Sequence, residues 1–132
     1  MKRTGILMLA IALGALAAFS HEQHESREVK LVGEVIDTAC YVSHDSRGPD
    51  HLECARECAA QGISLGILEE KTGRVYISLP VDHSNPNAKL TEFIAKRVEV
   101  KGTVFTKGGL KGLFVQSVRE LPAAPSGGAS QR

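Results

Sequence analysis

Apolar and polar residues alternate on both sides of a glycine-rich turn near the end of the chain. Residues 97–105 read RVEVKGTVF, and alternation puts four of them on one face: Val98, Val100, Gly102 and Val104. The turn TKGGLKG follows at residues 106–112, and the apolar-rich run LFVQSVREL occupies residues 113–121. A period of two is typical of a strand with one buried face. The sequence therefore predicts a hairpin of two strands, which requires a fold that contains a β-sheet.

Three further segments are predicted to be strands. Residues 29–39 (VKLVGEVIDTA) are rich in β-branched side chains, and Gly33 marks a bend or bulge within them. Residues 63–68 (ISLGIL) form a short apolar strand, and residues 74–79 (RVYISL) return as a strand after the turn EEKTG. Alternation along the strands and one apolar helix face predict the core: Val35, Ile36, Ile67, Val75, Ile77, Phe93, Val98, Val100, Val104 and Val115.

Two segments are predicted to be helices. Asp50 and Glu53 have the spacing of a capping box, so a helix is expected over residues 51–61, after a loop at 43–50. Gly62 stands where a left-handed C-terminal cap belongs. Residues 87–96 (NAKLTEFIAK) carry apolar side chains at helical spacing and predict a short amphipathic helix.

Without the first helix, the order of elements is three strands, a helix and two strands. That is the order of the OB-fold, so the fold class is mainly β with short helices: a five-stranded OB-fold-like barrel with a cysteine-bearing helix inserted between strands 1 and 2. A small α+β sandwich is the alternative. In its final hairpin the chain resembles small exported bacterial OB-fold proteins. From VGEVIDTACY through HLECARECA to GISLGIL it is similar to an uncharacterised group of such proteins with a Cys-Tyr, then His-x-x-Cys-x-x-x-Cys pattern. The resemblance covers about 90 residues and implies no particular activity.

Residues 1–20 have the layout of a secretory signal peptide, with basic Lys2 and Arg3 before an apolar run and small residues. The alternative is an uncleaved anchor, but the run is shorter than the ~20 residues of a membrane span. Cleavage near His21 would leave a flexible segment at 21–28, the OB-like domain at 29–121 and a disordered tail at 122–132. The protein is then expected in the periplasm or secreted.

Loss of Lys2 and Arg3 would change the formal net charge from +1 to −1. A near-neutral domain has no electrostatic surface for nucleic acid or for an anionic membrane. No nucleic acid partner is therefore expected, and no membrane association after cleavage of the leader.

All three cysteines fall between positions 40 and 58, with two histidines among them. On a helix, His51, Cys54 and Cys58 would form one stripe, because they stand at i, i+3 and i+7. Cys40 ends the preceding strand, and the loop is long enough to return it to that stripe. The predicted metal ligands are therefore Cys40, His51, Cys54 and Cys58. His44 is a reserve ligand, and Tyr41 could stack or donate a hydrogen bond.

Three interpretations of this cluster compete. Three thiolates and an imidazole suit Zn²⁺, and soft sulfur also suits Cu(I). An oxidising compartment favours a disulfide from Cys40 to Cys54 or Cys58, which would leave one odd thiol. Thiol redox chemistry ranks last, because Cys54 lies a turn inside the helix and no Cys-x-x-Cys precedes it.

The leading functional hypothesis is an exported, non-catalytic metal-binding protein that carries, senses or delivers copper or zinc. No Ser-His-Asp set, pair of carboxylates or phosphate-binding loop stands out in the sequence. The alternative is a disulfide-stapled module that recognises a protein or glycan through the barrel face. A thiol-redox accessory factor is a lower alternative. A protein partner is expected under the first hypothesis, although the sequence does not identify it.

Overall fold

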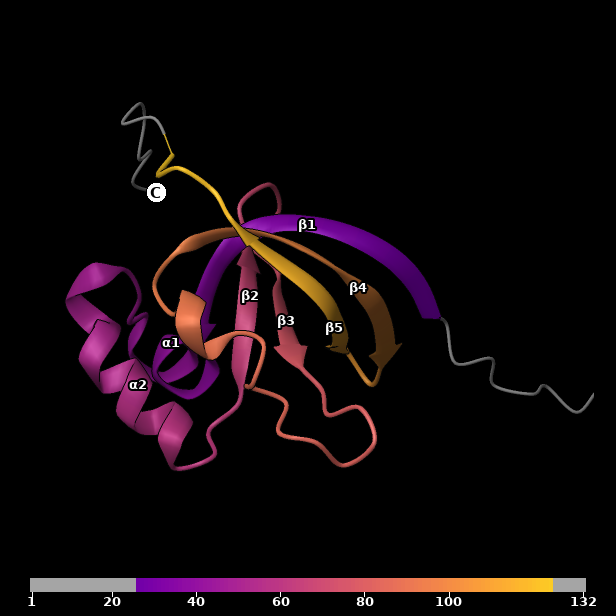
Figure 1. The fold of residues 1–132 in the computed structure, drawn as a ribbon, viewed down its shortest axis with the longest axis horizontal. Helices are drawn as coiled ribbons and strands as arrows, with labels where there is room; N and C mark the ends of the chain where they lie inside the picture. Colours follow the sequence, from indigo (N-terminus) through magenta and orange to yellow (C-terminus); the bar gives the residue numbers. More distant parts are fainter. Residues whose placement is uncertain (1–25, 125–132) are drawn as a thin grey trace, which may run out of the picture.

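Five strands close into a barrel in the order β1-β2-β3-β5-β4 (Figure 1). The computed structural model describes residues 26–124, so the predicted leader, most of the segment 21–28 and residues 125–132 of the predicted tail lie outside the described residues. The strands are β1 (Ser26–Asp37), β2 (Leu65–Glu69), β3 (Val75–Ser78), β4 (Arg97–Lys107) and β5 (Leu110–Glu120). The predicted five-stranded OB-fold-like barrel with an insertion between its first two strands is confirmed.

β1 is the long curved strand that pairs with two neighbours (Figure 1). Its first part pairs antiparallel with β4 and its last part antiparallel with β2, and Gly33 and Glu34 pair with both. A Cβ atom on Gly33 would lie 2.2 Å from the carbonyl oxygen of Leu68, so the close approach of β2 requires glycine there. On the other side of the barrel, β3 and β5 run parallel and pair through Ile77–Gly112 and Ser78–Leu113.

The core lies inside the barrel, and seven of the ten predicted core residues are buried: Val35, Ile36, Ile67, Val98, Val100, Val104 and Val115. Phe93 is partly buried and packs against this core, whereas Val75 and Ile77 are partly buried and lie outside it, so the prediction is wrong for these two residues. In β3 the inward side chains are Tyr76 and Ser78, both 2% exposed. The more hydrophobic face of β3 carries Val75 and Ile77, but the other face is the buried one. Hydrophobicity alone therefore predicts the wrong face. The buried hydroxyl of Ser78 is satisfied because it donates to the carbonyl oxygen of Pro86 (2.5 Å).

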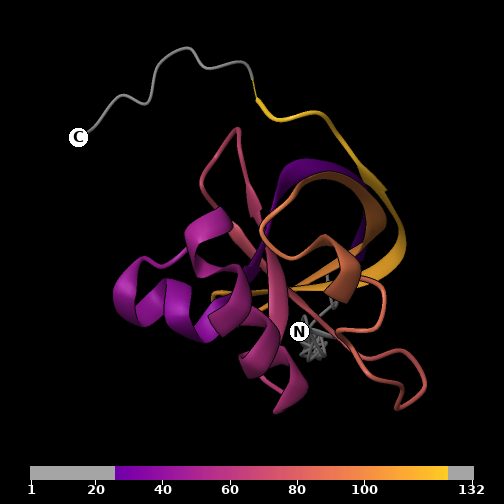
Figure 2. The ribbon, with the colours of Figure 1, turned by 60° about the vertical axis from the view of Figure 1, so that its left-hand side comes forward.

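The insertion between β1 and β2 contains two short helices, α1 (Thr38–His44) and α2 (Leu52–Ala60). Figures 1 and 2 show them together on one side of the barrel. The predicted strand over 29–39 instead runs over Ser26–Asp37, and Cys40 belongs to α1 rather than to a strand end. The cause is Asp37, whose Oδ1 accepts hydrogen bonds from the amides of Ala39 (2.9 Å) and Cys40 (3.3 Å) and so starts a helix.

The second helix begins later than predicted, after a 3₁₀ turn over Pro49–His51. Asp50 lies within this turn and does not cap α2, and Glu53 pairs with Arg56 (2.9 Å) instead of completing a capping box. The predicted C-terminal cap is confirmed. Gly62 has a φ of 90°, and the amide of Ile63 donates to the carbonyl oxygen of Cys58 (3.0 Å), as in a Schellman motif.

The predicted amphipathic helix over 87–96 is a loop with one 3₁₀ turn, Thr91–Phe93. The cause is Asn87, a buried residue whose side chain donates to the carbonyl oxygen of Ile63 (2.7 Å) and accepts from the amide of Leu65 (2.8 Å). These bonds hold the loop against the start of β2. None of the helices between residues 26 and 124 is long and apolar enough to cross a membrane.

Candidate metal centre

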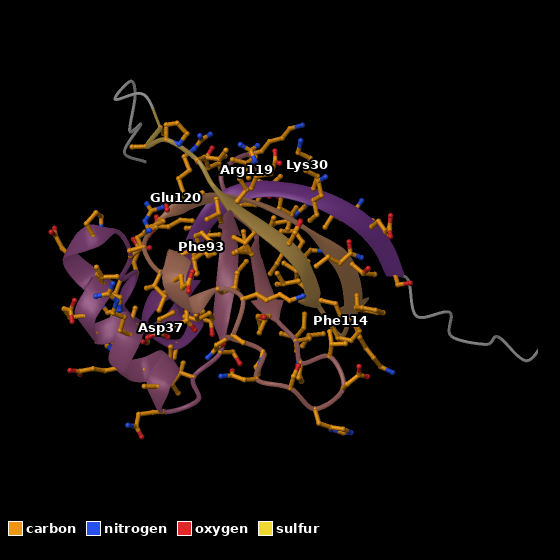
Figure 3. The ribbon with its side chains drawn as sticks, in the orientation of Figure 1. Lys30, Asp37, Phe93, Phe114, Arg119 and Glu120 are labelled. Carbon is orange, nitrogen blue, oxygen red and sulfur yellow. The ribbon has the colours of Figure 1, made fainter. Side chains whose placement is uncertain are left out.

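The cysteines come together where the insertion leaves the barrel. Cys40 is on α1, Cys54 and Cys58 are on α2, and His51 is the residue that directly precedes α2. Asp37, the last residue of β1, lies beside the helices and far from Phe114 (Figure 3). The end of a barrel strand and the two helices of the insertion therefore all contribute side chains to one place.

Hydrogen bonds from the barrel hold the insertion in position. The amide of Gly48 donates to the Glu34 carboxylate on β1 (2.6 Å), which fixes the turn before His51. The hydroxyl of Thr38 donates to the carbonyl oxygen of Ser64 (2.7 Å), which joins the two ends of the insertion. Ala55 of α2 is 2% exposed and packs into the barrel core. These contacts set the face of α2 that is turned toward α1.

Potential metal-ligating atoms form two groups that share one residue. The ligand atoms of Cys40, His51 and Cys54 all lie within 4.8 Å of one another. The ligand atoms of Asp37, Cys40 and Cys58 do the same. Among residues 26–124, the four predicted ligands do not all fall within one such group. Cys54 and Cys58 are one helical turn apart, about 6 Å along the axis, and this separates their partners.

None of the three cysteines, all within the described residues, forms a disulfide. The expectation of a structural disulfide between Cys40 and either residue of α2 is therefore not supported. Cys54 is exposed, whereas Cys40 and Cys58 are half-buried. The structure therefore contains three free thiols that differ in their exposure to solvent. Such thiols could hold a metal ion.

Two buried polar atoms in these groups lack hydrogen-bond partners among the described residues. They are Oδ2 of Asp37 and Nε2 of His51. An unpaired buried polar atom costs about 1–3 kcal/mol, so such atoms are uncommon in folded proteins. Asp37 and His51 also line one small cavity of about 10 Å³. Each group therefore contains a side chain whose buried atom is free to bind a ligand.

The Asp37 carboxylate controls the acidity of the neighbouring thiols. Burial raises the pKa of Asp37, but interaction with the Cys58 and Cys40 thiols and the amide hydrogen bonds outweigh it, so the pKa of Asp37 is lowered. The two thiols are near enough to lower the pKa of the carboxyl group, although neither forms a hydrogen bond with Oδ2. In turn, interaction with Asp37, followed by burial, raises the pKa of the Cys40 thiol and raises that of Cys58 to about 12.

Of the remaining predicted site residues, His44 belongs to neither group. His44 is exposed at the end of α1, and Tyr41 is half-buried and lines a neighbouring groove of about 530 Å³. From the sequence, Asp37 is only one of several acidic residues near the cysteines and is not among the predicted ligands. The sequence feature that indicates its capping role is the run Asp-Thr-Ala-Cys, in which a typical N-cap residue is followed by residues that can form a helix.

Comparisons of the chain with protein-family models, with curated proteins and with solved structures find no match. The class of protein is therefore described by its fold and its site alone. It is a small OB-fold-like barrel with a Cys/His group that could hold a metal ion.

Proposed function

We propose that this protein is exported and binds a soft metal ion, with copper as the first choice, in order to carry it and deliver it to a partner protein. The observation that carries the proposal is the group formed by Cys40, His51 and Cys54. Its ligand atoms lie within 4.8 Å of one another, and Nε2 of His51 is buried without a partner among the described residues. Two sulfurs and one imidazole nitrogen are a donor set for a soft ion.

The number of ligands favours Cu(I) over a structural Zn²⁺. Structural zinc sites are almost always tetrahedral with four protein ligands, whereas Cys40, His51 and Cys54 supply three. Cu(I) prefers soft ligands such as thiolates, and three ligands are enough to bind it. A three-ligand set also leaves one side of the ion open, so a ligand from a partner protein can replace one of the three during transfer.

The place of the site in the molecule supports carriage rather than a structural role. The buried core inside the barrel is continuous, and α1 contributes no fully buried residue to it. Cys54 is exposed, so an incoming protein can reach it. An ion at this site would not hold the barrel together and would be accessible for exchange. The predicted leader at residues 1–20 agrees with an extracytoplasmic role.

Thiol redox chemistry is less well supported by the electrostatics. Redox-active cysteines have a lowered pKa, because the thiolate is the nucleophile. At Cys40 and Cys58 the carboxylate of Asp37 does the opposite and raises the pKa of both thiols. Metal binding does not need a low pKa in the free protein, since the ion displaces the thiol protons when it binds.

The test is Cu(I) binding to untagged protein of residues 21–132 in the absence of oxygen, with a chromogenic chelator as competitor. We expect tight binding by the wild type and much weaker binding by Cys40→Ser. His51→Ala should weaken binding, whereas His44→Ala is the matched control and should not, because His44 is exposed at the end of α1. No Cu(I) retained by the wild type, or equal binding by Cys40→Ser, would overturn the proposal.

A further inference from the structure

We infer that Asp37, Cys40 and Cys58 form a second ion position, joined to the first by a shared Cys40 thiolate, so that the centre binds two soft metal ions. The inference rests on the proposed function, because it assumes that the first position binds an ion. It goes further in assigning a carboxylate ligand, Asp37, and a stoichiometry of two.

The geometry separates two positions around one sulfur. The ligand atoms of Asp37, Cys40 and Cys58 lie within 4.8 Å of one another, as do those of Cys40, His51 and Cys54. Cys54 and Cys58 stand one turn apart on α2 and therefore reach different partners. Cys40 on α1 faces both turns. A thiolate sulfur has several lone pairs, so it can bind two ions at once.

Burial gives independent support for the second position. Asp37 is 1% exposed, and its Oδ1 is occupied by the amides of Ala39 and Cys40. Its Oδ2 is also buried and has no hydrogen-bond partner among residues 26–124. A bound cation would give this oxygen a partner. The other unpartnered atom is Nε2 of His51, a residue of the first group, so each group contains one residue with a buried polar atom that lacks a partner.

The chemistry of loading is ligand exchange without a change of oxidation state. When the first ion binds, the S–H bonds of Cys40 and Cys54 break, both protons go to water and two sulfur–metal bonds form. When the second ion binds, only the S–H bond of Cys58 breaks, because Cys40 is already a thiolate and binds the second ion through another lone pair. The Asp37 carboxylate is already ionised and releases no proton. The first position binds through two sulfurs and a nitrogen, and the second through two sulfurs and an oxygen. The two ions share the negative charge of Cys40.

Native mass spectrometry after anaerobic titration with Cu(I) counts the ions directly. We expect two ions in the wild type and one in Asp37→Asn. Asparagine still caps α1 through its side-chain oxygen, so the helix start is retained while the anionic ligand is lost. Asp45→Asn is the matched control, because Asp45 lies at the other end of α1 in a left-handed conformation that asparagine tolerates. It should bind two ions.

The cysteine variants test the bridge. Cys54→Ser and Cys58→Ser should each retain one ion, at the position that keeps its three ligands. Cys40→Ser should weaken both binding steps by more than about tenfold, because both positions lose a ligand. Circular dichroism of the metal-free variants checks that each one is folded.

Each departure from this pattern has a distinct meaning. A single ion in the wild type, two ions retained by Asp37→Asn, or one ion held at full strength by Cys40→Ser would overturn the two-ion centre. In the first two cases the proposed function would still stand for the wild type, whereas binding at full strength by Cys40→Ser would overturn the proposed function as well. Absence of any ion in the wild type would instead overturn the proposed function itself.

Discussion

Asp37 uses its two carboxylate oxygens for different purposes. Oδ1 caps α1 through the amides of Ala39 and Cys40, and Oδ2 is buried without a hydrogen-bond partner among the described residues. One residue therefore sets both the backbone that positions Cys40 and the electrostatic environment of the sulfurs. Asparagine keeps a side-chain oxygen that can cap α1 but carries no charge, so this substitution separates the two effects.

Alkylation of the metal-free protein should report the effect of Asp37 on the thiols. Interaction with Asp37 and burial raise the pKa of Cys58 to about 12, so the thiolate is scarce and Cys58 should react far more slowly than the exposed Cys54. In Asp37→Asn the carboxylate charge is gone, the pKa of Cys58 falls, and the thiolate fraction at a given pH rises. Iodoacetamide labelling followed by peptide mass spectrometry should show faster modification of Cys58.

Asp45→Asn is the control for the change of charge, and its labelling rates should match those of the wild type. Labelling of Cys58 at an unchanged or slower rate in Asp37→Asn would show that another feature, such as access of the reagent, controls this thiol.

At the scale of elements, β4 is bound to its neighbours on both sides. Lys30 of β1 and Arg119 of β5 each form an ion pair with Glu99 of β4, at 2.9 and 3.1 Å, and both labels lie close together in Figure 3. Their hydrogen bonds lower the pKa of Glu99 below its ordinary value of 4.5. This ion-pair cluster therefore adds its stabilisation only while Glu99 is ionised.

The contribution of Glu99 should depend on pH in a defined direction. A carboxyl group with a lowered pKa stabilises the folded state above its unfolded pKa, and this contribution is lost as the pH falls through the folded pKa. Glu99→Gln should therefore lower the Tm at neutral pH by a small amount, since the pairs are near the surface. The difference from wild type should begin to shrink near pH 4.5 and vanish below the folded pKa. The exposed Glu92→Gln should show no such pattern in thermal unfolding followed by circular dichroism.

The β4–β5 hairpin contains one position where a methyl group cannot fit. A Cβ atom on Gly102 would lie 2.3 Å from the carbonyl oxygen of Phe114, beside a shift in the pairing register between Lys101 and Gly102. Backbone cannot move aside as a flexible side chain can. Gly102→Ala should therefore lower the free energy of unfolding by about 1–3 kcal/mol in urea titrations. Lys101→Ala, on the exposed face of the same strand, should change it by less than about 0.5 kcal/mol. Equal effects of the two would contradict the steric explanation.

Elements with one apolar face could be predicted from the sequence, and elements decided by a single polar contact could not. In β4 the alternation of Val98, Val100 and Val104 leaves one choice of face, and all three are buried. In β3 both faces carry large side chains, and the buried face is the one with Tyr76 and Ser78. The helix α1 was missed because it begins at Asp37, which follows directly from β-branched residues that favour a strand.

At the scale of the whole molecule, the order of strands was enough to predict the barrel, but not the division of the site. The spacing of His51, Cys54 and Cys58 predicts one stripe on a helix, but only Cys54 and Cys58 lie on α2, and His51 lies in the 3₁₀ turn before it. The spacing could not show that Cys40 lies on a helix facing these residues, nor that Asp37 is buried beside it. Both facts depend on how the insertion packs against the end of β1, which is a long-range property of the fold.

The barrel and the insertion differ in what stabilises them. The barrel encloses a continuous buried core, whereas α1 contains no fully buried residue and α2 contains one, Ala55. A segment with few buried apolar contacts opens locally at a lower free energy than the core strands. In the metal-free protein the insertion should therefore be the less stable part of the described chain.

Hydrogen exchange should show this difference and its removal by metal. In the metal-free protein, amides of α1 and α2 should exchange much faster than those of β4 and β5, which exchange only through global unfolding. An ion that binds the folded insertion but not its open form stabilises it by mass action. Cu(I) should therefore slow exchange in residues 38–60 and leave the central amides of β4 unchanged, and Cys40→Ser should abolish the effect. Equal protection of the insertion and the barrel before Cu(I) is added would show that the helices are already held by packing, and that the ion does not order them.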